Sequence, residues 1–368
     1  MISRRAAQLA AAILFWPAAG RGGDGSWAPA LPGYRFTFPA YFGAHERSRN
    51  EWWYYTGHLR DSQGRRYGFE ETIFRYGVQH PVPNGSPWDI DDLYFAHFAI
   101  TDVDGKRFVF FDRAGRSALG GAGASSGAER AWVGDWSVAR DRSGVHLLAA
   151  SVSEASLRLR LTPETRPTIN GRNGISRKGA CATCASHYYS FTRLRASGAL
   201  RVDGDSHAVS GLAWNDHEWG SDELAPGVAG WDWFSVQLDG GTQFMLYRLR
   251  FKDGGSVPQS SGTIVRADGS SRALALSDFS IAATGSWVSP HDGATYPSGW
   301  RLTLPHEQAD LTVAPLLADQ ELSTSRSTRV SYWEGACEIS GTLRGARVRG
   351  YGYTELTGYA PGGLGGLR

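Results

Sequence analysis

The sequence predicts an all-β protein made of two tandem antiparallel β-barrels, on three observations. The chain has 368 residues, which suits two domains that each bury a core. Aromatic residues make up 12% of the chain and 47 residues are Gly, a mixture that fits pleated sheets joined by tight turns. Short alternating segments separated by turn signals recur along the chain, and no window keeps a helical period.

The sequence also repeats itself, with the same motifs in the same order. An aromatic strand, a Gly turn, a second strand and an Arg occur in both copies. The repeat predicts a first barrel over residues 34–224 and a second over 228–360, joined by a short Pro/Gly linker. Barrels of this size commonly hold one apolar ligand. The matched segments are 52–75 with 232–250, 97–107 with 261–272, 135–163 with 285–305, 188–200 with 332–343, and 211–219 with 350–359.

The first 20 residues have the order of a secretory signal. Arg4 and Arg5 precede a short apolar stretch that ends in small residues near Gly20. This stretch is too short to cross about 30 Å of hydrocarbon, so a membrane anchor is disfavoured. We therefore expect a signal peptide over residues 1–20 and an exported, periplasmic protein.

Charge and cysteine content disfavour two further classes, nucleic-acid-binding proteins and zinc proteins. The net charge is +2 and only three cations are lysines, so no basic patch indicates nucleic acid binding. Cys181 and Cys184 form a Cys-x-x-Cys motif, and Cys337 is the third cysteine. A loop disulfide or free thiols are favoured over a zinc site with His187, because no second Cys-x-x-Cys accompanies the first.

The densest chemistry lies in the segment "GLAWNDHEWGSDE", residues 211–223. If this segment closes the first barrel, its two-residue period places Asp216 and Glu218 on one face, and His217 and Trp219 on the other. Three ionisable groups beside tryptophans make a poor core, so this cluster is the candidate site. Other polar residues within strands are explained as hydrogen-bonded or ion-paired interior groups, namely His58, Glu70, Glu71, Arg75 and His97.

Several reactions can be weighed against these residues. No G-x-S-x-G is present for a serine hydrolase, and His58, His97 and His217 have no metal-binding spacing. Glycoside hydrolysis by paired carboxylates stays open, since it depends on their separation. Acid catalysis on an alkene fits best, because a desolvated carboxylic acid can protonate carbon and aromatic faces stabilise the cation. Asp216 or Glu218 would supply the acid.

Four stretches resemble the carotenoid 1,2-hydratase (hydroxyneurosporene synthase-like) family, including its exported AttH-like members: "NEWWYYTGHL", "GLAWNDHEWGS", "GWDWFSVQLDGGTQFMLYRLR" and "YWEGACEISG…GYGYTELTGY". The resemblance covers about residues 35–360 and implies two lipocalin-like barrels with a hydrophobic ligand. Hydratase members of the family add water to an isoprenoid double bond without a cofactor, and distant fungal relatives shape cyclisations. The exported members, which this chain resembles more than the pigment hydratases, are associated with ABC transport systems.

The sequence thus leaves two hypotheses. The first is a cofactor-free and metal-free hydratase or cyclase for an isoprenoid or lipid-like molecule, in which Asp216 and His217 form an acid-base pair. The second is an exported, non-catalytic carrier that works with an ABC transporter, its charged cluster bracing the barrel junction. The predicted catalytic residues are Asp216, His217 and Glu218, to which the family resemblance adds Tyr247. The predicted ligand-binding residues are Trp53, Tyr55, His97, Tyr189, Trp214, Trp219, Trp231 and Trp233.

Overall fold

The computed structural model describes residues 27–79, 86, 88, 90–222 and 224–364, and the predicted signal segment over residues 1–20 lies outside them. The described part consists of strands joined by turns, which confirms the all-β prediction. None of its helices is long and apolar enough to cross a membrane. Its helices are short 3-10 turns: η1 (Ala40–Phe42), η2 (Ala118–Gly120), η3 (Leu276–Asp278) and η4 (Pro305–Glu307).

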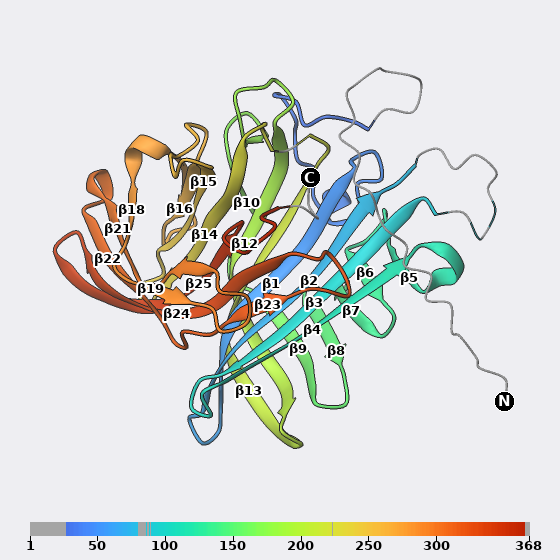
Figure 1. Ribbon diagram of the computed structural model, residues 1–368, viewed down its shortest axis with the longest axis horizontal. Helices are drawn as coiled ribbons and strands as arrows, with labels where there is room; N and C mark the ends of the chain where they lie inside the picture. The colour runs from blue at the N-terminus through green and yellow to red at the C-terminus, as the bar shows by residue number, and fades with distance from the viewer. Residues whose placement is uncertain (1–26, 80–85, 87, 89, 223, 365–368) are drawn as a thin grey trace.

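The first sheet has 13 strands and curls into the first barrel (Figure 1). Its order is β4-β3-β2-β1-β13-β12-β9-β8-β7-β6-β5, and the short β10 and β11 pair with β12. The sheet closes on itself because β5 and β6 lie against β3 and β4. The strands are β1 (Asn50–Asp61), β2 (Arg66–Gly77), β3 (Asp92–Asp102), β4 (Arg107–Arg116), β5 (Ala122–Ala124), β6 (Arg130–Val133), β7 (Trp136–Arg140), β8 (His146–Ser151), β9 (Ala155–Pro163), β10 (Thr168–Ile169), β11 (Ser176–Arg177), β12 (Ala185–Val202) and β13 (Asp205–Gly220).

The second sheet has ten strands in the order β17-β16-β15-β14-β25-β24-β22-β21-β18, with β23 paired to β24. A separate hairpin is formed by β19 and β20. The strands are β14 (Val228–Leu238), β15 (Gln243–Phe251), β16 (Ser261–Val265), β17 (Ser271–Ala275), β18 (Ser280–Ala283), β19 (Ser286–Val288), β20 (Thr295–Pro297), β21 (Trp300–Leu304), β22 (Ala309–Pro315), β23 (Glu321–Ser323), β24 (Ser331–Leu343) and β25 (Ala346–Thr357).

The two sheets share one topology, as the sequence repeat predicts. Strands β14 and β25 take the central places of β1 and β13, and β24, β22, β21 and β18 take those of β12, β9, β8 and β7. Four predicted motif pairs agree with this order. The pair 135–163 with 285–305 does not, because residues 286–288 belong to the separate hairpin and the strand at 300–304 occupies the place of β8 rather than β9. The inserted hairpin shifts the sequence match by one strand.

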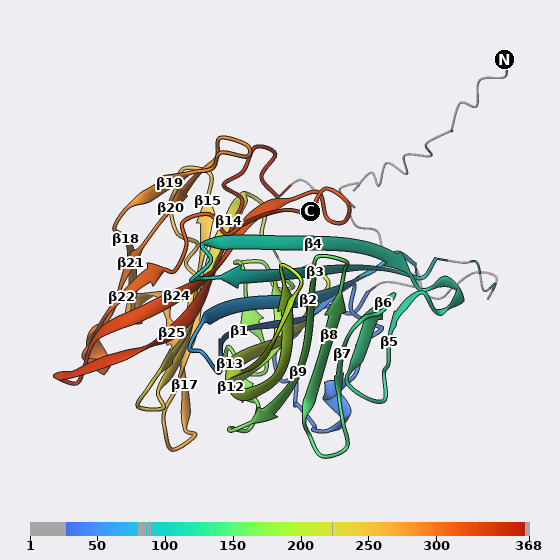
Figure 2. The same ribbon diagram turned by 90° about the horizontal axis from the view of Figure 1, so that it is seen from below.

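The barrels lie side by side and each buries its own core (Figures 1 and 2). Alternation along β1 sends Trp53 and Tyr55 into the first barrel and Tyr54 to the opposite face, where it packs on Trp233 of the second barrel. Further hydrogen bonds cross between the barrels, such as that from the Gln237 amide to the Ala213 carbonyl at 3.0 Å. A third buried layer therefore lies between the barrels, which we call the interface.

Candidate functional site

Strand β13 divides the predicted site between two compartments. Asp216 is buried at the interface beside Trp214, and His217 is buried in the first barrel with Trp219. The two-residue period of the strand is confirmed, because β13 pairs in regular register with β1. The side chains of Asp216 and His217 consequently point away from each other across the sheet. The predicted acid-base pair is not assembled, and each residue belongs to a different polar cluster.

Asp216 has a carboxyl group held by three donors at the interface. The Ser190 hydroxyl lies 2.5 Å and the Trp214 indole nitrogen 2.7 Å from Oδ1, and the Tyr188 hydroxyl lies 2.8 Å from Oδ2. The Trp233 indole of the second barrel donates in turn to the Tyr188 hydroxyl at 3.2 Å. Burial raises the pKa of Asp216 to about 7, despite these hydrogen bonds, so the acid is partly protonated at neutral pH.

Glu218 lies next along the same face and is paired with a lysine. Lys178 Nζ is 2.9 Å from Glu218 Oε1, and it sits 4.2 Å from the ring centre of Tyr247. The Tyr247 hydroxyl donates to the Arg177 carbonyl at 2.9 Å. Tyr247, a predicted site residue, therefore contacts the lysine that neutralises Glu218.

The loop that carries Lys178 is closed by a disulfide between Cys181 and Cys184. A backbone hydrogen bond also closes the loop, because the main-chain N–H of Lys178 donates to the Cys184 carbonyl at 2.8 Å. Of the two states that the sequence left open, a loop disulfide or free thiols, Cys181 and Cys184 form the disulfide. Cys337 is a buried free thiol in the second barrel.

Three further carboxyl groups complete the interface, and we call them the carboxyl cluster together with Asp216 and Glu218. Burial raises the pKa of Glu355 to about 7 and that of Glu70 to about 8. The pKa of Glu334 lies well above its ordinary value, through burial and the nearby charges of Glu355 and Glu70. The Tyr54 hydroxyl of the first barrel donates to Glu334 at 2.7 Å. The cluster therefore joins both barrels.

Two oxygens of this cluster are unsatisfied. Glu70 Oε2 and Glu334 Oε2 are buried without a hydrogen-bond partner among the described residues. Buried polar atoms nearly always have a partner, and where the protein supplies none, a water or a ligand can. The interface is thus the place where a polar group of a bound molecule would be accepted.

The other predicted ligand-binding residues also divide between the two compartments. Trp214, Trp231 and Trp233 pack in the interface. His97 lies there as well, with Nδ1 2.7 Å from the Tyr332 hydroxyl, and burial lowers its pKa to about 3, so it stays neutral. The first-barrel lumen holds Trp53, Tyr55, Tyr189 and Trp219.

The lumen holds a second polar cluster, centred on Glu51. Glu51 Oε1 lies 2.8 Å from His217 Nε2 and 2.8 Å from His45 Nδ1, and Arg75 Nε lies 3.1 Å from Oε2. The Tyr189 hydroxyl lies 2.8 Å from His217 Nδ1. Burial opposes ionisation of Glu51, but His45, His217 and Arg75 together hold its pKa below the ordinary value. Glu51 is therefore an ionised carboxylate that holds His45, His217 and Arg75 together in the lumen.

The metal set considered from sequence, His58, His97 and His217, is not assembled. His58 Nε2 binds the Gly352 carbonyl at 2.8 Å, and His97 also faces the second barrel.

Arg75 does pair with carboxylates, as expected, but with Glu51 and with Asp92 at 2.9 Å rather than with the neighbouring glutamates of β2.

Sequence reasoning missed several of these residues. Glu51 lies two residues before Trp53 in β1, so its side chain is on the same face of the strand and could have been placed in the lumen by alternation. Lys178 gave no local signal, because a loop residue reaches the cluster only through the tertiary fold. Glu334 was hidden in the same way, since its partners lie on the first barrel.

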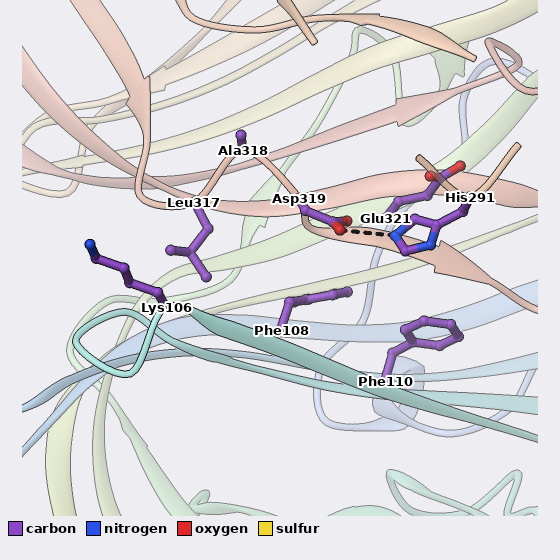
Figure 3. Close-up of a pocket in the computed structure, with 8 residues that line it drawn as sticks. All are labelled: Lys106, Phe108, Phe110, His291, Leu317, Ala318, Asp319 and Glu321. Carbon is purple, nitrogen blue, oxygen red and sulfur yellow. Dashed lines mark hydrogen bonds and ion pairs between the residues drawn. The ribbon is translucent and has the colours of Figure 1, made fainter. Parts of the chain in front are cut away.

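A surface hollow of about 270 Å³ opens on the seam between the barrels (Figure 3). Phe108 and Phe110 of β4 form one wall, and the segment 317–321 of the second barrel forms the other. His291 and Asp319 are hydrogen bonded at its rim, 2.9 Å apart. The hollow combines apolar walls with charged groups, which suits a molecule that has both an apolar body and a polar end. Its lining residues are Lys106, Phe108, Phe110, His291, Leu317, Ala318, Asp319 and Glu321.

Fold and site together define a protein of tandem lipocalin-like barrels with a buried carboxyl cluster between them. The chain belongs to the AttH-like family, which it matches over residues 29–359. A crystal structure assigned as AttH from Nitrosomonas europaea is 34% identical, with a TM-score of 0.81, covering 90% of this chain and 100% of that one.

Two other solved structures share the fold at low identity. Kievitone hydratase from Nectria haematococca is 15% identical with a TM-score of 0.69, over 90% of this chain and 97% of its own. CghA with Sch210972 is 14% identical with a TM-score of 0.51, over 91% and 96%. No curated protein matches the sequence significantly.

Proposed function

We propose that this protein is a hydratase-type enzyme that protonates a carbon-carbon double bond of a hydrophobic, isoprenoid or lipid-like molecule bound between the barrels. The observation that carries the proposal is the Asp216 carboxyl, which is buried, has a pKa raised to about 7 and lies 2.7 Å from the Trp214 indole nitrogen. A general acid works best when its pKa is near the operating pH.

The surroundings of Asp216 suit a cationic intermediate. Proton transfer from the carboxyl to one alkene carbon leaves a carbocation on the other and a carboxylate on Asp216. The faces of Trp214, Trp233 and Tyr188, which pack together in the buried interface, can stabilise this cation. Attack by one water molecule forms the C–O bond, and the proton it releases restores the Asp216 acid, so that the net reaction adds one water.

Lys178 fits a supporting role in this scheme. Its ammonium pairs with Glu218 at 2.9 Å and lowers the pKa of Glu355, against the larger effect of burial. One carboxylate of the cluster is thereby neutralised by a cation, while neighbouring carboxyls keep their protons. An apolar substrate would approach through the hollow beside Phe108 and Phe110, which pack against the buried seam.

One solved structure of the same fold is a hydratase by name, which supports the reaction class without fixing the substrate. We also propose that the protein works after export to the periplasm. The disulfide between Cys181 and Cys184 supports this location, because disulfides persist in oxidising compartments.

The test begins with the molecules that co-purify with the full chain, identified by native mass spectrometry. Each is then incubated with the protein in ¹⁸O-labelled water. The proposal expects a product heavier by one labelled water, formed by the wild type and by the control Asp205→Asn but not by Asp216→Asn. Asp205 is an exposed carboxylate at the first position of β13.

Three outcomes count against the proposal. Release of the bound molecule unaltered and in stoichiometric amount favours the carrier that pairs with a transporter. Equal turnover by Asp216→Asn and the wild type removes this residue from the chemistry. Failure to retain any apolar molecule counts against both the enzyme and the carrier.

A further inference from the structure

We propose that the first barrel carries a binding site for one divalent transition-metal ion, best suited to Zn²⁺, formed by His45, Glu51 and His217. Their ligand atoms, two imidazole nitrogens and a carboxylate oxygen, all lie within 4.8 Å of one another. Two histidines and one glutamate, with a further position left open, form a ligand set that zinc uses in enzymes. The site lies in the lumen, on the other face of the sheet from the carboxyl cluster.

The positions of the two ring nitrogens support this assignment. His45 Nδ1 and His217 Nε2 each lie 2.8 Å from the same oxygen, Glu51 Oε1. Both nitrogens therefore point to one locus, where a metal ion would replace their contacts with Glu51. Zinc lies about 2.0–2.1 Å from imidazole nitrogen, so small side-chain movements suffice to admit it.

Each ligand is oriented by a partner behind it. The Tyr189 hydroxyl lies 2.8 Å from the other nitrogen of His217. Glu51 Oε2 accepts from Arg75 Nε at 3.1 Å and from the backbone nitrogen of His45 at 2.9 Å. The His45 ring stacks on Trp219 with ring centres 3.6 Å apart. Partners of this kind fix the rotamers and tautomers of ligands in natural metal sites.

Charge and an unused donor point to what occupies the open position. The single carboxylate of Glu51 cannot balance both Arg75 and a divalent ion, so an anionic ligand or hydroxide at the open position would reduce the positive charge. Trp53, whose ring centre is 4.9 Å from that of His217, has an indole nitrogen without a partner among the described residues. That nitrogen can donate to such a ligand.

The experiment uses the full chain without a polyhistidine tag, stripped of metal with a chelator. Zn²⁺ is titrated by calorimetry, and Co²⁺ is added as a spectroscopic probe of coordination. The proposal expects saturation at one ion per chain, with the visible absorption of low-coordinate Co²⁺. His45→Ala should abolish this saturation, and His45 is the ligand to replace because its side chain is 13% exposed, whereas those of Glu51 and His217 are fully buried.

Two matched variants separate ligation from packing. Tyr189→Phe keeps the ring but removes the hydroxyl behind His217, and it should weaken Zn²⁺ affinity by about 10–100-fold. His187→Ala changes a neighbouring ring, 5.7 Å from Trp219, that binds the Gly174 carbonyl instead of Glu51, and it should leave affinity unchanged. Near-ultraviolet circular dichroism checks that each variant is folded.

The proposal is overturned if the wild type binds no Zn²⁺ under these conditions. It is equally overturned if folded His45→Ala binds as the wild type does, because the ion then lies elsewhere. A loss in His187→Ala as large as that in His45→Ala would also contradict it, since packing of the aromatic cluster would then explain both results.

Discussion

The substitution Asp216→Asn tests whether this buried carboxyl is held protonated near neutral pH. The pKa of Asp216 is raised from 3.8 to about 7, and each pKa unit corresponds to about 1.4 kcal/mol. Ionising this group in the folded state therefore costs about 4 kcal/mol more than in the unfolded state. The variant keeps one acceptor oxygen for Trp214 and cannot ionise.

The sign follows from the direction of the shift. Because the folded pKa is raised, the stability linked to the protonated acid is fully present below pH 3.8 and is lost as the pH rises through about 7. Between pH 5 and pH 8 the wild type should lose about 2.5 kcal/mol from this group alone. Asp216→Asn cannot ionise at this position and should not lose this stability. The free energy of unfolding of the variant minus that of the wild type should therefore rise by about 2.5 kcal/mol between pH 5 and pH 8.

Urea unfolding of both proteins, followed by tryptophan fluorescence at several pH values from 5 to 8, measures the difference. Asp205→Asn, at an exposed position, serves as the control and should differ from wild type by the same amount at every pH. If the difference between Asp216→Asn and wild type is also independent of pH, within about 0.5 kcal/mol, the assignment of Asp216 as a protonated acid is wrong.

Three further predictions concern the ion pair, the central strand pairing and the free thiol. Lys178→Met leaves Glu218 buried without its cation and should cost about 3 kcal/mol in urea unfolding, and adding Glu218→Gln should restore most of it; no recovery would contradict the pairing. Gly211→Ala would place a Cβ 1.9 Å from a carbonyl oxygen of β1 and should cost at least about 1–3 kcal/mol, whereas Gly240→Ala, with open space around it, should be near neutral. Burial raises the pKa of Cys337 to about 12, so a thiol reagent should label it only after unfolding, and rapid labelling of the native protein would refute its burial.

Local patterns predicted most of the fold. Alternating segments and Gly turns gave the strands, and the repeat gave two sheets of one topology. The same alternation placed Asp216 and Glu218 on the face opposite His217 and Trp219. What these patterns could not provide was the identity of each face. A strand between two packed barrels is buried on both sides, so burial alone does not distinguish lumen from interface.

The site was accessible from sequence only in part. The acid Asp216 and its aromatic neighbours follow one another in β13, so one segment displayed them. Lys178 and Glu334 reach the same cluster from a disulfide loop and from the second barrel, and no sequence period relates them. The predicted pairing of Asp216 with His217 went wrong because adjacent residues in a strand point to opposite faces.

The claim that the interface stores a protonated acid is tested most directly by infrared spectroscopy of the wild type and of Asp216→Asn between pH 5 and pH 9. We expect an absorption from protonated carboxyl groups that persists at pH 6 and titrates with a midpoint near 7, with one component missing in the variant. Complete ionisation of the carboxyls by pH 6, or identical spectra for the two proteins, would contradict the claim that an acid is stored between the barrels.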